Sequence, residues 1–515
     1  MTPSPAPRPS SGARRRRGGT KPAAASGPSG GFVTLDGEAY YRISACDRMP
    51  PFLMSVASDS DLWMFVTSGG GLTAGRRDAD GALFPYETVD KLHDGHHHTG
   101  PVTLLRVRRA RGSGIAWEPL SAHSAEDPRV ERNLYKNVLG NRLVFEEVHH
   151  GLGLAFRYRW TGSDGLGLVR TATLENLGDS AVTVELLDGL RNVLPWGAPL
   201  ALYQQSSCLV DAYKRSDLDP ETGLGIYSLT TEITDRPEPG ERLRANVVWC
   251  HGLGEPEVSL SLHAVAAFRR GDAVPRASVL TGARGNYLAA ASLELAPAAR
   301  ARWHVVTDVG RSHVQIAALR ARLRAGGNLC AWIEASLDEA GENLRRDVAS
   351  ADGLQLTGHT EASVHHFANV LFNNMRGGVF ARNHDVPTAD LLDLVATRDR
   401  AVAERHRAAL RALPEQVPVA ELLRTVAGWQ DPDLLRLCYE YLPITFGRRH
   451  GDPSRPWNRF SIQVRNPDGS RALRYEGNWR DIFQNWEALC TSFPAFLPGV
   501  IARFVNASTA DGFNP

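Results

Sequence analysis

The sequence predicts a large antiparallel β-sandwich domain, then a helical linker, then a domain of helices. Residues 31–310 contain many short runs in which apolar and polar residues alternate, as is typical of half-buried strands. After Ser312 the spacing of the apolar residues changes to three and four, and from residue 361 onward helical runs dominate. Because the strands come first and the helices afterwards, we expect two separate domains rather than alternating β-α units.

Residues 1–30 are expected to form a disordered tail. They are rich in Arg, Pro, Ser, Gly and Ala, so they offer little to bury in a core. Residues 14–17 are all arginine, but no apolar stretch follows them, so the tail does not read as a secretory signal. A solvated tail is expected; contact with an acidic partner is the alternative.

The clearest hairpin signal of the β domain lies at residues 169–186. Residues 169–174 alternate, a turn-forming stretch follows at 176–179, and residues 181–186 alternate again. Similar runs recur at 143–147, 154–160, 245–249, 258–264 and 303–306. The span of about 280 residues exceeds the ~100 of an immunoglobulin-like sandwich, which favours a large two-sheet domain.

Residues 311–360 are predicted to be a helical linker, with helical runs at 314–323 and 329–348 separated by Gly326-Gly327. The helical domain is predicted over residues 361–515, and Pro387-Thr388 and Asp431-Pro432 are typical helix starts within it. The expected helical runs are 362–375, 389–412, 419–427, 432–441 and 482–489.

Composition and charge exclude several classes of protein. The formal net charge of +1 provides no global field to attract nucleic acid, and no stretch approaches the ~18–20 apolar residues needed to cross a bilayer. The six cysteines are scattered and form no CxxC pair, which predicts a reducing, cytoplasmic location. No metal site is expected, because the consecutive histidines 96–98 cannot all face one ion.

The densest polar and aromatic segment is 471–487, where a helix is predicted to begin near Trp479. It brings together a guanidinium fork, a carboxylate, two amides and two indoles, which are the groups that bind sugar hydroxyls and the apolar face of a sugar ring. The candidate substrate-binding residues are Trp479, Arg480, Asp481, Gln484, Asn485 and Trp486. The alternative is a helix cap with an i, i+4 pair on an ordinary core helix.

The run Trp479-Arg480-Asp481-Ile482-Phe483-Gln484-Asn485 resembles, position by position, the F-R-D-S-G-Q-D-like segment of the inverting glycoside phosphorylases typified by cellobiose phosphorylase. The resemblance implies a galactose-mutarotase-like β-supersandwich over residues 31–310 and part of an (α/α)6 toroid over residues 361–515. It also implies that Arg480 and Asp481 hold the nonreducing-end sugar. The implied reaction is inverting phosphorolysis of a glucoside or oligosaccharide to a sugar 1-phosphate, with inorganic phosphate as co-substrate and no other cofactor.

The sequence departs from the family at one position and resembles it in one further segment. Asn485 stands where the family has a second Asp, which keeps a hydrogen-bonding group but removes a charge. The Gly-rich residues 68–75 are expected to form a β-turn between strands rather than a phosphate loop, because no Lys-Ser/Thr pair and no helix follow them. The N-terminal strand-and-loop segment at residues 59–75 is also similar to the entry of phosphorylase sandwich domains, where such a segment can reach toward a neighbouring active site.

A second polar segment, residues 448–458, is a candidate substrate or phosphate loop because it offers several hydrogen-bond donors and an exposed aromatic ring. Its candidate residues are Arg448, Arg449, His450, Asp452 and Trp457. Residues 373–378 are expected either to line the same face or to form a simple helix end. A solvated interhelical loop is the alternative for 448–458, since Gly, Pro and Asp are ordinary turn formers.

The helical domain is expected to be incomplete. Twelve helices with their connections need about 190–200 residues, whereas residues 361–515 number 155. The resemblance places the general acid, an Asp, further along the barrel, so we expect it beyond Pro515 in a longer gene product. A smaller, complete helical domain of another fold is the alternative.

Three functions stay open at this point: a glycoside phosphorylase, a glycoside hydrolase on the same scaffold, and a truncated, non-catalytic sugar-binding protein. The expected partners are an oligosaccharide or disaccharide and, as a further option, a second copy of the chain in a homodimer. No nucleic acid and no membrane are expected.

Overall fold

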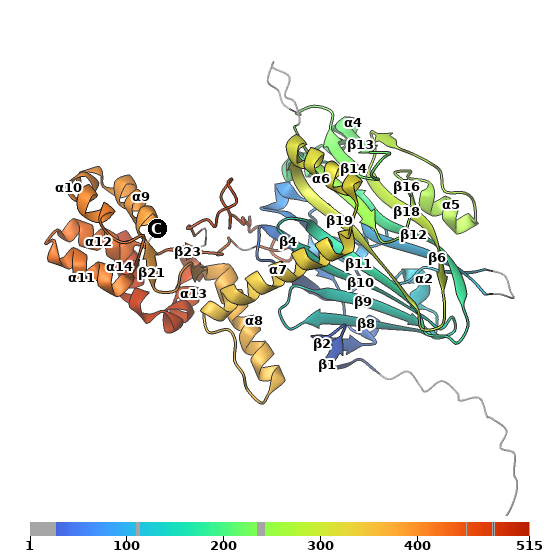
Figure 1. The fold of residues 1–515 in the computed structure, drawn as a ribbon, viewed down its shortest axis with the longest axis horizontal. Coiled ribbons are helices and arrows are strands. Elements are labelled where there is room, and N and C mark those ends of the chain that lie inside the picture. The colour runs from blue at the N-terminus through green and yellow to red at the C-terminus, as the bar shows by residue number, and fades with distance from the viewer. Residues whose placement is uncertain are drawn as a thin grey trace, which may run out of the picture.

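The computed structural model describes residues 27–109, 114–233, 243–449, 451–475, 477 and 479–513, without the side chains of residues 479–481. These residues form a large antiparallel sheet domain and a helical region, joined by a long helix, α7 (Leu329–Ser350) (Figure 1). Most of the predicted tail lies outside the described residues, and the first strand already begins at Ser29.

Two sheets form the β domain, and every strand pairing described within them is antiparallel. The larger sheet has eleven strands in the order β1-β2-β8-β9-β10-β11-β19-β15-β14-β13-β17. They are β1 (Ser29–Leu35), β2 (Glu38–Ser44), β8 (Val130–Asn137), β9 (Leu143–His149), β10 (Leu154–Ser163), β11 (Gly167–Asn176), β13 (Lys214–Leu218), β14 (Gly225–Leu229), β15 (Arg244–His251), β17 (Val279–Thr281) and β19 (Arg300–Ser312). The smaller sheet has five strands in the order β16-β18-β12-β6-β7, namely β6 (Gly100–Arg108), β7 (Ile115–Trp117), β12 (Val182–Val193), β16 (Glu257–Ser259) and β18 (Gly285–Leu295).

The two sheets share one hydrophobic core. Trp160 of β10 and Trp303 of β19 are fully buried in it, and Leu186 of β12 enters the same core from the smaller sheet. The alternation seen in the sequence places one set of side chains of each strand between the sheets.

A three-stranded sheet and several short helices complete the β domain. The small sheet consists of β3 (Leu53–Val56), β4 (Leu62–Thr67) and β5 (Leu72–Arg76). The short helices are η1 (Cys46–Arg48), η2 (Ala79–Gly81), α1 (Val89–Gly95), α2 (Ala122–Ala125), α3 (Leu200–Gln205), α4 (Ser207–Tyr213) and α5 (Ala264–Arg270). The predicted run 258–264 is not one strand: β16 ends at Ser259, whose hydroxyl bonds the backbone of Ser261 and Pro275 and so competes with continued sheet pairing.

The linker begins with α6 (His313–Ala325), which a capping box of Ser312 and Gln315 starts. Helix α7 then belongs to two cores. Its Ile333 and Leu337 pack with side chains of the larger sheet, whereas Leu344 and Val348 pack in the core of the helical region. This helix therefore fixes the helical region to the β domain.

The helical region has its own core. Its elements are α8 (Thr360–Gly377), β20 (Val379–Phe380), β21 (Asp385–Pro387), α9 (Thr388–Arg398), α10 (Arg400–Arg411), β22 (Gln416–Pro418), α11 (Val419–Gly428), α12 (Pro432–Glu440), β23 (Ile444–Thr445), α13 (Trp479–Ser492), η3 (Pro494–Phe496) and α14 (Leu497–Ala507). Helix α8 ends because Gly378 has φ of 81°, which favours glycine. Helix α13 packs against α8, and α14 packs against α12.

The segment between β23 and α13 returns to the β domain. Phe460, Ile462 and Val464 are buried in a cluster that also contains Trp63 and Tyr86. The rings of Trp63 and Phe460 meet edge to face, with centroids 5.1 Å apart. A long loop of the helical region is thereby packed against the β3–β5 sheet, and the candidate site lies beside this contact.

Candidate functional site

A cavity of about 330 Å³ lies where the β3–β5 sheet, the end of α8 and the loop after β23 meet. We call it the junction pocket. Strands β3 and β4 form its apolar wall, α8 adds Phe372, Met375 and Arg376, and the loop adds Arg448, Arg449, Gly451, Asp452, Ser454, Phe460 and Ile462. Its volume and mostly apolar lining with few polar groups are typical of a small-molecule site.

Arg448 is the most deeply placed cation of the junction pocket, with 9% of its surface exposed. Its backbone N–H donates to the Met375 carbonyl at 2.9 Å, which ties the loop to the end of α8. Its Nη2 donates to the carbonyls of Ser58 and Ser60, at 3.1 and 3.4 Å. Burial lowers the pKa of Arg448 to about 10, although nearby carboxylates oppose this shift.

The junction pocket carries an excess of positive charge. Arg376, Arg448 and Arg449 all line it, and within the described part of the chain no carboxylate forms an ion pair with any of them. Asp452 is the one acid among the lining residues, and it accepts hydrogen bonds from the backbone and hydroxyl of Ser454. Asp59, Asp61 and Asp347 lie near Arg448 and balance part of its charge, so Arg376 and Arg449 are the guanidinium groups left to favour an anionic or polyhydroxylated ligand.

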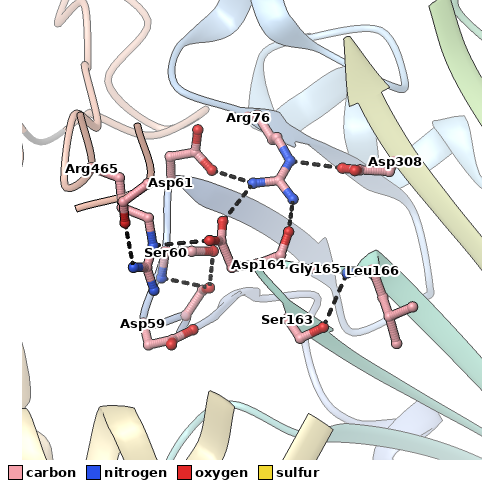
Figure 2. Close-up of polar contacts among 12 residues, drawn as sticks. Asp59, Ser60, Asp61, Arg76, Ser163, Asp164, Gly165, Leu166, Asp308 and Arg465 are labelled. Atoms are coloured by element: carbon pink, nitrogen blue, oxygen red, sulfur yellow. Dashed lines mark hydrogen bonds and ion pairs between the residues drawn. The ribbon is translucent and has the colours of Figure 1, made fainter. Parts of the chain in front are cut away.

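Behind the junction pocket, a group of ion pairs fixes the loop to the β domain (Figure 2). Arg76 of β5 is paired with Asp61, Asp164 and Asp308. Arg465 of the loop pairs with Asp164 at 2.9 Å. These pairs hold the segment before β4, which carries the carbonyls that Arg448 contacts, in a fixed position.

Two buried carboxylates, Asp59 and Asp347, also lie near Arg448. Asp59 is 8% exposed; its Oδ2 accepts from Asn343 of α7 at 3.2 Å, while Oδ1 has no partner within the described structure. Burial raises the pKa of Asp59 to about 6. Asp347 of α7 pairs with Arg471 at 2.6 Å, and burial raises its pKa although Arg471 opposes this. We call Asp59, Asp347, Arg448, Arg465 and Arg471 the junction cluster.

The predicted loop falls partly in this site. Arg448, Arg449 and Asp452 line the junction pocket. His450 lies outside the described residues. Trp457 is 76% exposed and is not among the lining residues, so its ring lies in solvent.

The predicted sugar-binding segment lies at the start of α13. The side chains of Trp479, Arg480 and Asp481 lie outside the described structure. Gln484 is exposed. Asn485 is buried and donates to Asn373 Oδ1 at 3.0 Å.

Trp486 is only 2% exposed, and its Nε1 donates to the Gly377 carbonyl at 2.8 Å. Its ring lies near those of Tyr475 and Phe504, so it packs α13 against α8 and offers no open face to a ligand. The end of α8 is therefore contacted by both α13, through Trp486, and the loop, through the backbone of Arg448. Residues 373–378 form the helix end that was one of the two expectations, and Met375 and Arg376 also line the junction pocket.

Sequence reasoning singled out Arg448 and the segment that contains Asp59, but it missed the other members of the junction cluster. Asp347 and Arg471 carry no motif, and they become neighbours only because α7 and the loop fold back onto one another. The segment 59–61 was recognised by its resemblance, but its contact with Arg448 spans about 390 positions of the chain.

No set of three or more metal-ligating side chains occurs among the residues that the structure describes. In the same residues, every helix is too short or too polar to cross a membrane.

The comparison with protein families finds one match. Residues 380–443 match glycoside hydrolase family 149 insertion domain 1. This segment contains α9, α10, α11 and α12, so helices that the sequence assigned to a toroid are similar to an insertion domain of a carbohydrate-active family. The match supports a glycoside hydrolase or phosphorylase-like relationship and does not single out cellobiose phosphorylase. No curated protein matches the sequence.

Solved structures resemble the chain only distantly. A bacterial glucoamylase complexed with acarbose has a TM-score of 0.30 and 9% identity, and the match covers 77% of this chain and 55% of that one. A proposed aldose 1-epimerase from Klebsiella pneumoniae has a TM-score of 0.29 and 10% identity, over 59% of this chain and 92% of that one. A proposed kojibiose phosphorylase from the human microbiome has a TM-score of 0.23 and 8% identity, over 68% and 33%. The chain therefore spans about half of the matched glucoamylase.

Proposed function

We propose that this chain belongs to a carbohydrate-active enzyme of the glycoside phosphorylase type, which binds an oligosaccharide and inorganic phosphate at the junction pocket. The observation that carries the proposal is the excess of arginines in that pocket. The adjoining helices α9–α12, which match an insertion domain of a glycoside hydrolase family, support a carbohydrate substrate.

In this proposal the arginines of the junction pocket hold phosphate. Arg376 comes from the end of α8 and Arg449 from the loop after β23, and Arg448 lies deeper. Guanidinium donors from two segments that line one pocket are suited to binding a single anion. Asp452 would accept sugar hydroxyls, and the Arg480, Asp481 and Gln484 side chains of α13 would hold the nonreducing end.

The reaction that the resemblance implies is an inverting one. A carboxylic acid gives its proton to the glycosidic oxygen, and a phosphate oxygen attacks the anomeric carbon from the opposite face. The products are a sugar 1-phosphate and the shortened saccharide. A hydrolase would instead need a second carboxylate, ~6.5–9.5 Å from the acid, to activate water.

Isothermal titration with inorganic phosphate tests the phosphate site directly. We expect wild type to bind phosphate, and Arg376→Ala and Arg449→Ala each to weaken binding about tenfold, as for one lost charge-assisted hydrogen bond. Arg455→Ala is the matched control, because Arg455 is exposed in the same loop and does not line the pocket. Equal affinity in wild type and both pocket variants would overturn the assignment.

A turnover assay separates the three functions. Glucose disaccharides of different linkage are incubated with and without phosphate, and the products are identified. Sugar 1-phosphate formed only with phosphate supports the phosphorylase, free sugar without phosphate indicates the hydrolase, and binding without turnover indicates a non-catalytic sugar-binding protein.

A further inference from the structure

A second cavity of about 330 Å³ lies on the other side of β3, between the edge of the larger sheet and α8. We call it the sheet-edge cavity. Strands β1, β2 and β8 form one wall, and α8 forms the opposite wall. Its apolar lining includes Phe52, Met54, Leu134, Phe367, Leu371 and Met375. Because it is apolar on both walls, it is a poor site for a sugar and a good one for hydrocarbon.

The mouth of the sheet-edge cavity exposes large apolar side chains. Phe372 of α8 is 47% exposed, Tyr41 of β2 is 41% exposed, and Phe32 of β1 is 36% exposed. Phe32 and Tyr41 meet edge to face with centroids 5.2 Å apart. Three aromatic side chains around one opening form an exposed apolar patch of the kind that marks a binding site.

One cationic side chain lies among the apolar residues that line the sheet-edge cavity. Lys136 of β8 lines the cavity, and its Nζ donates to the Ser55 carbonyl at 2.8 Å. An ammonium group has three donors, and within the described residues no carboxylate pairs with this one. Burial lowers the pKa of Lys136 to about 8, which agrees with a cation that lacks a counter-ion.

We propose that the sheet-edge cavity binds an amphipathic carboxylate, such as a fatty acid, with its carboxylate on Lys136 and its hydrocarbon between β2 and α8. The charge selects an anionic head group, because a carboxylate supplies the counter-ion that Lys136 lacks. The two apolar walls select an unbranched or aromatic hydrocarbon tail rather than a polyhydroxylated one.

This ligand would also contact residues that form a wall of the junction pocket. Met54, Phe372 and Met375 line both cavities, so a bound hydrocarbon would hold the end of α8 against β3. The proposal concerns a different ligand and a different wall from the phosphate site, and it does not depend on the proposed function.

Titration calorimetry with hexanoate, octanoate, decanoate and decanol tests the ligand class. Each added methylene should tighten carboxylate binding by up to about fourfold, the effect of burying one CH₂. Decanoate should bind at least about tenfold more tightly than decanol, because only the carboxylate forms a charge-assisted hydrogen bond with Lys136. Affinity that does not change with chain length would overturn the proposal.

Variants distinguish the cavity from unspecific binding. Lys136→Met should weaken decanoate about tenfold or more and leave decanol unchanged, whereas Lys91→Met is the matched control, since Lys91 is 66% exposed and pairs with Glu87. Ala368→Phe, which fills the cavity from α8, should remove binding of both ligands and preserve the circular dichroism spectrum and the cooperative thermal unfolding of wild type. Unchanged decanoate affinity in either Lys136→Met or Ala368→Phe would contradict the site.

Discussion

Two groups of buried charges in this molecule differ in how completely their carboxylates are paired. In the β domain, Arg170 and Asp188 are both fully buried and joined by two hydrogen bonds of 2.8 and 2.9 Å. Thr103 and Trp303 also donate to Asp188. All four residues come from strands of the same sandwich, so the carboxylate is surrounded by donors within one domain.

The junction cluster is less complete. Its charges come from the segment before β4, from α7 and from the loop after β23, and Asp59 Oδ1 is a buried carboxylate oxygen without a partner in the described structure. Arg448 Nε also has no partner there, but the same is true of Arg170 Nε, so the difference between the two groups lies in their carboxylates. Buried polar atoms without partners are costly. The comparison indicates that the pair in the sandwich stabilises a domain, whereas the junction cluster is where a ligand or a proton can change the energy of the domain contact.

The largest effect is expected from breaking the Arg170–Asp188 pair. Asp188→Ala leaves Arg170 buried without a counter-charge, so we expect the free energy of unfolding to fall by about 3–5 kcal/mol. Urea unfolding followed by circular dichroism measures this loss. The double variant Arg170→Met/Asp188→Leu, which removes both charges, should lose less; an equal loss would mean that packing rather than charge explains the effect.

A smaller effect is expected at the junction cluster. Arg471→Ala leaves Asp347 buried without its ion-pair partner, but Arg471 is 41% exposed, so solvent screens part of the interaction and we expect about 1–2 kcal/mol. Limited proteolysis should show faster cleavage within residues 451–475. Arg474→Ala, which changes an exposed arginine of the same loop, is the control, and equal cleavage of the two variants would argue against an anchoring role for Arg471.

The contrast between contacts within one domain and contacts between distant segments also explains what the sequence could predict. Alternation at residues 169–174 and 181–186 located the strands β11 and β12. The hairpin expected from the turn between them is wrong, because β11 belongs to the larger sheet and β12 to the smaller one, and β11 is buried along most of its length rather than on one face. The run 258–264 failed because serine hydroxyls bond the backbone there. Local patterns thus reveal elements, including the polar loop that contains Arg448.

The sequence contains no comparable pattern for contacts between segments that are far apart in the chain. Trp486 looked like a sugar platform in the sequence, yet its indole is buried and bonded to Gly377. The pairing of Asp347 with Arg471 and the approach of residues 58–60 to Arg448 depend on how α7 and the loop pack. Periodicity does not encode these contacts, so the junction cluster required the structure.

The smallest expected effect concerns the proton of Asp59. Because burial raises the pKa of Asp59 from 3.8 to about 6, the folded protein holds this proton more tightly than the unfolded chain. Stability linked to Asp59 is therefore full below about pH 4 and is lost as pH rises through about 6. Asp59→Asn does not ionise, so it should be more stable than wild type at pH 7, by about 1 kcal/mol after the altered bond to Asn343 is allowed for.

Thermal unfolding of wild type and Asp59→Asn at several pH values tests this sign. Asp347 and the other acids titrate in both proteins, so the difference between the two curves reports Asp59 together with its charge interactions with Asp164 and Asp347. The difference should grow in favour of the variant between pH 4 and 6 and stay constant above it. A difference that does not change with pH would mean that the pKa of Asp59 is the same in the folded and the unfolded protein. Folding would then not desolvate this carboxylate, and Asp59 would not be an incompletely paired buried group.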